Sequence, residues 1–172
     1  MSTIKVNSIV PVSGVPTGGG GGIVQIKSTT KTDTFSTANH SFTDITGLSV
    51  SITPTSTSSK IFIIAFVTGL GTSNTRANFK LLRGSTEICQ GDAAGSRPRC
   101  FGGIYTDDAE TPETVSVNFL DSPSTTSATT YKIQISSGNS VDAVYVNRAN
   151  GDTDSAAHAR TASTITVMEV SA

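Results

Sequence analysis

The sequence predicts an all-β protein, an antiparallel β-sandwich of jelly-roll-like form that follows an extended N-terminal arm. Ser and Thr make up 51 of the 172 residues. The branched side chains of Thr and Val favour the pleated surface of a strand, while Ser, Gly and Asn favour turns. Apolar and polar residues alternate with period two along much of the chain, which is typical of half-buried antiparallel strands. No stretch has a convincing helical period.

The arm comprises residues 1–22 and cannot build a core of its own. Pro11 and Pro16 stop any helix, and the glycines at 18–22 have the backbone freedom of a hinge. We expect the arm to add its few apolar side chains to another protein, although a disordered tail is the alternative. These apolar residues are Ile4, Val6, Ile9 and Val10.

Residues 23–172 form the predicted sandwich. Alternation is clear in five segments, at 48–52, 113–119, 131–135, 143–147 and 163–170. Turn-forming residues cluster between strands, at 53–59, 83–85, 122–127, 137–140 and 149–152. Residues 80–88 predict a tight hairpin about Arg83 and Gly84. Several short strands with frequent turns are typical of a sandwich or jelly roll.

The segment 60–69 is apolar on both of its faces. A sandwich sheet buries one face in the core, and the chain has no predicted helix to cover the other. The second face must therefore meet an extra layer of the same chain or another copy of the protein. The C-terminal strand shows the same property. We expect a homo-oligomer whose interface includes Phe62, Ile64, Phe66, Met168 and Val170.

Charge and hydropathy exclude several partners. The net charge is −1, so no basic surface for a nucleic acid or an anionic membrane is expected. The longest apolar run, 61–67, is far shorter than the roughly 20 residues that span a bilayer. Residues 1–20 lack the apolar run of a secretory signal, so we expect synthesis in the cytoplasm.

The candidates for chemistry are few, and we predict neither an enzyme nor a cofactor. His40 and His158 stand in polar segments without a second ligand at metal-binding spacing. An acidic cluster could supply a glycosidase pair, but the chain has no Trp and only three Tyr for sugar platforms, so a solvated loop is favoured. That cluster is Asp107, Asp108, Glu110 and Glu113.

Two further motifs favour structural explanations. Asn150, Asp152 and Asp154 imitate the first half of a calcium loop, but Ser155 and Thr161 replace the Gly and Glu that fix its geometry. An ordinary Asn-Gly turn is therefore favoured over a weak cation site. Two cysteines, Cys89 and Cys100, match no zinc pattern, and free thiols are favoured over a disulfide.

The order of several phrases carries a resemblance. The opening "MSTIKVNSI", the glycine hinge, "GIVQIKSTTKTDTFST", "SFTDITGLSVSITPTSTSSKIFIIAFVTG" and the closing "STITVMEV" resemble phage virion proteins of the fibre and spike kind, especially those of marine cyanophages. The resemblance spans nearly the whole chain, and the segment 89–113 matches least well. It implies an N-terminal segment that attaches to the virion and a β-domain that trimerises.

Together these features predict a non-enzymatic structural protein of a phage particle. Its arm would dock onto other virion proteins of the capsid or tail, partly by main-chain pairing. Its homotrimeric sandwich would present hydroxyl-rich loops that could contact a host surface glycan. A capsid decoration protein is the main alternative, and a glycan depolymerase is the less favoured one.

Overall fold

The protein consists of strands and loops, as expected. The computed structural model describes residues 22–72, 74–105 and 112–171, and this part of the chain contains no helix and hence none that could cross a membrane. Its strands are β1 (Ile23–Lys31), β2 (Phe35–Thr37), β3 (Thr43–Ile52), β4 (Lys60–Thr72), β5 (Arg76–Arg83), β6 (Thr86–Ile88), β7 (Gly102–Tyr105), β8 (Glu113–Asp121), β9 (Thr129–Ser137), β10 (Val144–Val146) and β11 (Ser163–Val170).

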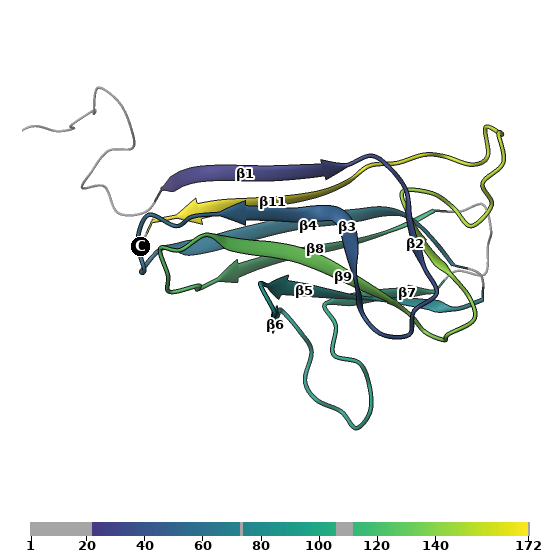
Figure 1. Ribbon diagram of the computed structural model, residues 1–172, viewed down its shortest axis with the longest axis horizontal. Coiled ribbons are helices and arrows are strands. Elements are labelled where there is room, and N and C mark those ends of the chain that lie inside the picture. Colours follow the sequence, from purple (N-terminus) through teal and green to yellow (C-terminus); the bar gives the residue numbers. More distant parts are fainter. Residues whose placement is uncertain (1–21, 73, 106–111, 172) are drawn as a thin grey trace, which may run out of the picture.

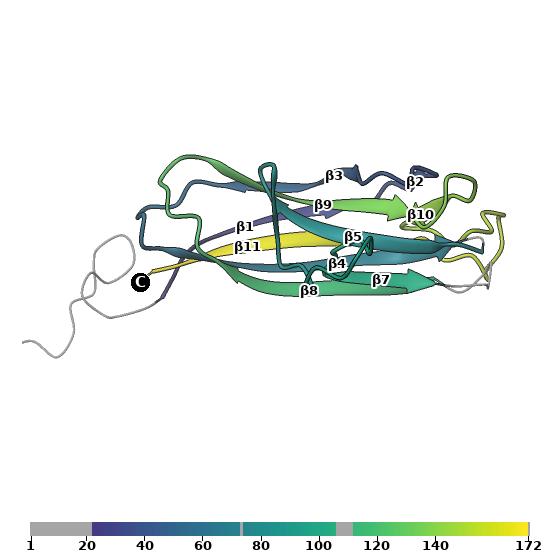
Figure 2. The same ribbon diagram turned by 90° about the horizontal axis from the view of Figure 1, so that it is seen from below.

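The strands form two antiparallel sheets that pack face to face (Figures 1 and 2). The first has the order β1-β11-β4-β8, and the short β10 and β2 extend it from the end of β4. The second has the order β3-β9-β5, and both β6 and β7 pair with β5. If the three-residue strands are set aside and the rest are numbered along the chain, the orders are 1-8-3-6 and 2-7-4-5. This is the arrangement of a jelly roll.

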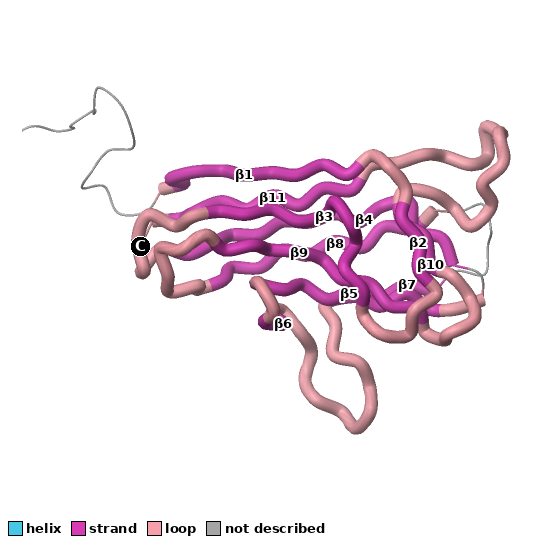
Figure 3. Tube along the Cα trace, in the orientation of Figure 1, coloured by secondary structure: helices cyan, strands magenta, loops and turns pink. Residues whose placement is uncertain are grey.

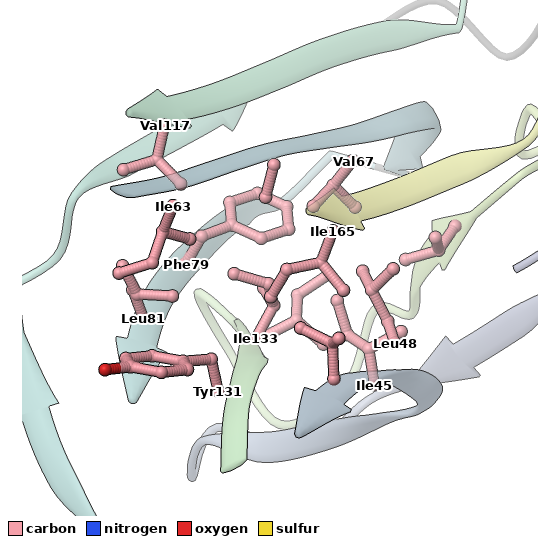
Figure 4. Close-up of a cluster of buried hydrophobic side chains, with 14 of the residues drawn as sticks. Ile45, Leu48, Ile63, Val67, Phe79, Leu81, Val117, Tyr131, Ile133 and Ile165 are labelled. Atoms are coloured by element: carbon pink, nitrogen blue, oxygen red, sulfur yellow. The ribbon is translucent and has the colours of Figure 1, made fainter. Parts of the chain in front are cut away.

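The core lies between the two sheets because each long strand turns alternate side chains inward. Strand β11 alternates strictly between buried and half-buried residues, and β9 does so over most of its length. Figure 4 shows side chains of both sheets meeting, with Ile63 and Ile165 from one sheet and Phe79 and Ile133 from the other. Burial of such aliphatic and aromatic groups stabilises the fold by about 25 cal/mol per Å² of apolar area.

The strands predicted from alternation are present. Segment 163–170 coincides with β11, whereas segment 143–147 is reduced to the three residues of β10. The predicted hairpin is confirmed, because β5 and β6 pair and Gly84 at the turn has a φ of +58°. Strand β7 was not predicted, because its glycines mask the alternation. Gly102 is required there, since a Cβ would lie 2.7 Å from Val115.

The sandwich has two different ends (Figure 1). At one end β1 begins and β11 finishes, and Gly22 and Ser171 exchange hydrogen bonds of 2.9 and 3.0 Å. At the opposite end lie the loops that follow β1, β4, β9 and β10. The loop between β6 and β7 projects from the second sheet (Figure 3). Residues Ile4, Val6, Ile9 and Val10 of the arm lie outside the described residues.

Candidate functional site

The outer face of the first sheet carries an apolar row that crosses all four long strands. Ile26 of β1 lies opposite Met168 of β11, and Met168 lies opposite Phe62 of β4. Phe62 in turn lies opposite Leu120 of β8. Ile26 and Leu120, at the two ends of the row, are 55% and 54% exposed. Within residues 22–72, 74–105 and 112–171 no segment covers this row.

Neighbouring side chains widen the row into a larger surface. Ile64, Phe66 and Val170 point to the same side as Phe62 and Met168, and Phe66 is 47% exposed. The prediction that 60–69 and the C-terminal strand have a second apolar face is therefore confirmed, while a role in an interface stays a prediction. We call this surface the apolar face; its residues are Ile26, Phe62, Ile64, Phe66, Leu120, Met168 and Val170.

Sequence reasoning missed two members of the apolar face. Leu120 comes directly after Phe119, which packs against the core, so the alternation of β8 points Leu120 outward. Ile26 required the pairing of β1 with β11 before its side of the sheet could be assigned. Leu120 could have been found from the alternation of its own strand. Ile26 could be found only from the register between β1 and β11, which lie at opposite ends of the chain.

The outer face of the second sheet is polar. Lys132 of β9 pairs with Asp44 of β3 at 2.8 Å, and Gln134 donates to the same carboxylate at 2.7 Å. Lys80 of β5 pairs with Glu87 of β6 at 2.6 Å. The hydrogen bond from Lys132 lowers the pKa of Asp44 below its ordinary value. This face is suited to water.

A buried carboxylate lies behind the apolar face. Glu169 of β11 is fully buried and accepts hydrogen bonds of 2.7 Å from the Gln25 side chain and from both the amide and the hydroxyl of Thr55. Burial raises its pKa, but these bonds and one from Ser59 outweigh that effect and lower the pKa to about 2. The network ties the start of β1 to the loop between β3 and β4.

A second buried network joins the two sheets. The hydroxyl of Tyr131 on β9 donates to Asp121 on β8 at 2.7 Å, and Arg83 contacts both oxygens of this carboxylate at 2.9 and 3.0 Å. Burial and the hydrogen bond to Asp121 raise the pKa of Tyr131. The phenol therefore stays neutral at pH 7. The network fixes the edge strand β8, which carries one end of the apolar row.

The candidates for chemistry do not converge. His40 is exposed, and its Nδ1 lies 3.1 Å from the Ser137 carbonyl oxygen. The second histidine, His158, instead contacts Thr153. Within the described residues no group of three or more His, Cys, Asp or Glu is arranged to hold a metal ion. Cys89 and Cys100 are free thiols, and burial raises the pKa of each. Their low nucleophilicity favours a structural role.

The acidic cluster supplies no pair of carboxylates within the part of the chain that the structure describes. Asp107, Asp108 and Glu110 lie outside the described residues, and Glu113 is exposed at the start of β8. Of the calcium-like motif, Asp152 pairs with Arg148 and Arg160. That carboxylate is thus already neutralised by the protein's own cations. The apolar face remains the strongest candidate site.

The chain matches no protein-family model and no curated protein sequence at a significant level. The function is therefore inferred from the fold, the apolar face and the sequence.

Proposed function

We propose that the protein is a structural component of a phage particle, a fibre or spike protein whose sandwich forms a homotrimer through the apolar face. The single observation that carries the assembly part of the proposal is the apolar row from Ile26 to Leu120, while the trimer and the phage particle are what the resemblance implies. Monomeric soluble proteins rarely leave large continuous apolar patches in water. A second copy of the same chain is always available to cover the patch, and oligomers of identical chains close most simply as small rings.

The two ends of the sandwich support the attachment part of the proposal. Since β1 starts next to the end of β11, residues 1–22 join the domain at that one end. The longest loop of the described chain, between β10 and β11, lies at the opposite end. A protein docked by its arm would therefore hold this loop away from the particle. The resemblance of the opening, of the segments 22–37 and 41–69 and of the closing 163–170 to fibre and spike proteins likewise implies attachment by the N-terminal segment.

A deletion of residues 2–22 tests the proposal. We expect the truncated protein to fold and to keep its oligomeric mass, because the apolar face and the core lie entirely within the sandwich. We also expect it to be absent from purified particles, since the docking arm is gone. Mass photometry gives the oligomeric state, and immunoblotting of particles gives incorporation relative to the full chain.

Incorporation of the truncated protein at the level of the full chain would refute docking by the arm. A full-length protein that is monomeric at micromolar concentration would refute the trimer. Cryo-electron microscopy of the particle separates the two structural roles: density on the icosahedral shell rather than the tail would make the protein a decoration protein.

A further inference from the structure

The segment between β10 and β11 is a long loop with a rigid base. Asn147 is fully buried in the left-handed conformation, with a φ of 63°. Its side-chain amide donates to the carbonyls of Lys31 and Asp33 at 2.9 and 2.8 Å, and its side-chain oxygen accepts from Ser163 at 2.6 Å. The amide of Thr161 donates to the Asn147 carbonyl. The two ends of the loop are thereby held together on the sandwich.

The loop is also tied internally. Asp152 accepts from Arg148 and Arg160, which form an isolated antiparallel bridge, and the Arg148 guanidinium lies 4.1 Å from the centre of the Tyr145 ring. His158 Nδ1 lies 2.7 Å from the Thr153 hydroxyl. Compact loops of this kind, whose ends are close and whose side chains pack on each other, frequently carry function.

These ties border a polar hollow of about 290 Å³ that is partly open to solvent. Its lining consists of Asp152, Thr153, Asp154, Ser155, His158 and Arg160. None of these side chains is apolar, and carboxylates, hydroxyls and a guanidinium offer both donors and acceptors. Gly151 borders the hollow, since a Cβ there would lie 2.6 Å from the His158 ring. An apolar ligand would form no hydrogen bond with the carboxylates, hydroxyls and guanidinium of this lining.

The charges of the hollow point to a neutral ligand. Asp152 offsets much of the charge of Arg148 and Arg160, so no strong positive field remains for an anion. Asp154 takes part in no ion pair among the described residues, and the side chain of Arg160 is 57% exposed, with guanidinium N–H groups beyond the one that Asp152 accepts. A free carboxylate acceptor and free guanidinium donors lie at one site. Adjacent hydroxyls of a sugar ring can both donate and accept in this way.

We propose that the hollow binds one neutral pyranose unit of a surface saccharide. Asp154 would accept hydrogen bonds from ring hydroxyls and Arg160 would donate to a hydroxyl oxygen, while Asp152 holds Arg160 in place. The hollow lies near the lower limit of about 300 Å³ for small-molecule sites, which suits one sugar ring. This inference rests on the proposed function, because three weak sites on one trimer gain avidity only in a multivalent assembly.

Titration of the full chain with four monosaccharides tests the proposal. Glucose, galactose, mannose and N-acetylglucosamine are followed separately by saturation-transfer NMR, with sodium sulfate and calcium chloride as competing probes. We expect one of the sugars to bind with a Kd of about 1 mM, as is usual for a single ring with few contacts. We expect Asp154→Asn and Gly151→Ala each to weaken that binding at least tenfold. Asp92→Asn, which changes another exposed carboxylate on the loop between β6 and β7, is the matched control and should leave Kd unchanged.

No saturation by any of the four sugars at 20-fold the expected Kd would overturn the proposal. Equal effects of Asp154→Asn and Asp92→Asn, or loss of the sugar signal on addition of sulfate or calcium, would overturn it as well. Particle incorporation and oligomeric mass of the Asp154→Asn variant are measured in parallel. If the wild-type chain binds none of the sugars but is incorporated into particles and keeps its oligomeric mass, the hollow is rejected and the proposed function stands.

Discussion

The two outer faces of the sandwich are built from the same kind of strand but carry opposite chemistry. On the second sheet, Asp44, Gln134 and Lys132 form a cross-strand cluster of polar groups. On the first sheet, the equivalent outward positions of four strands are filled by Ile26, Met168, Phe62 and Leu120. The outer face of the second sheet is therefore suited to contact with water, whereas that of the first sheet is suited to burial against another protein layer.

The difference has an energetic consequence. Ion pairs exposed on the second sheet contribute about 0–1 kcal/mol each, because water screens them and long side chains lose freedom. Apolar groups on the first sheet gain about 25 cal/mol for every Å² that a partner removes from water. The two faces thus differ in the free energy that burial against a partner would release, so substitutions on them should have unequal effects.

The largest effect is expected from charges placed in the apolar row. Phe62→Lys combined with Leu120→Lys puts two ammonium groups on each copy at the centre and end of the row. Burying them against another copy would cost several kcal/mol per group, so the oligomer should dissociate to monomers. Sedimentation velocity at micromolar concentration measures this change.

The matched control is Gln134→Lys, which adds a charge to the outer face of the second sheet beside Asp44. We expect this variant to keep the wild-type mass. Dissociation of the control and the double variant alike, or of neither, would show that the apolar face is not where copies meet. Far-ultraviolet circular dichroism checks that both variants remain folded.

The next effect concerns Glu169, which lies on the inner side of β11 behind the apolar face. Its pKa is lowered from the ordinary 4.5 to about 2. The charged form is therefore favoured by the fold, so its contribution is complete above pH 5 and is lost as the pH falls towards 2. The shift corresponds to about 3 kcal/mol. Glu169→Gln should lose a similar amount at pH 7.

Urea unfolding at pH 7, 5, 4 and 3 measures this contribution. The wild-type free energy of unfolding should fall more steeply with acid than that of Glu169→Gln, and the two curves should approach each other near pH 3. Parallel curves would mean that the carboxylate does not titrate with folding. The variant should keep its oligomeric state wherever it is folded, because its apolar face is intact.

The two faces also show how far sequence can lead. Period-two alternation identifies most strands, because inward apolar and outward polar residues alternate along a half-buried strand. It also identifies Phe62 and Met168 as outward and apolar, since each lies next to inward apolar neighbours on its own strand. Alternation does not reveal which strands are neighbours. The row from Ile26 to Leu120 exists only because β1, β11, β4 and β8 pair in that order.

The buried polar residues are the other part that sequence does not reveal. Glu169 and Asn147 are polar residues of the kind usually left in water, yet both are fully buried. Their partners, Gln25 and the carbonyl of Lys31, are more than a hundred residues away along the chain. Such groups are tolerated only because every polar atom finds a partner, and that condition is a property of the fold.

A smaller effect is expected where the sheets are joined. Tyr131→Phe removes the hydroxyl that donates to Asp121 and leaves the carboxylate with Arg83. Loss of a hydrogen bond to a charged group in a buried site costs about 1.5–3 kcal/mol, and the remaining partner should keep the loss near the lower value. Urea unfolding at pH 7 gives the difference. Lys132→Ala, which removes a half-buried partner of the exposed Asp44 on the same strand, is the comparison and should cost less.

The smallest effect is expected on the polar face itself. Asp44→Asn removes the charge that pairs with Lys132 and keeps the acceptor for Gln134. Because the pair is exposed to solvent, the free energy of unfolding at pH 7 should change by about 0.5 kcal/mol or less. The hydrogen bond from Lys132 lowers the pKa of Asp44, so even this small contribution should vanish as acid protonates the carboxylate. A loss of stability as large as that of Glu169→Gln would contradict the prediction that the polar face contributes little to stability. A change in oligomeric mass would contradict the prediction that copies meet only through the apolar face.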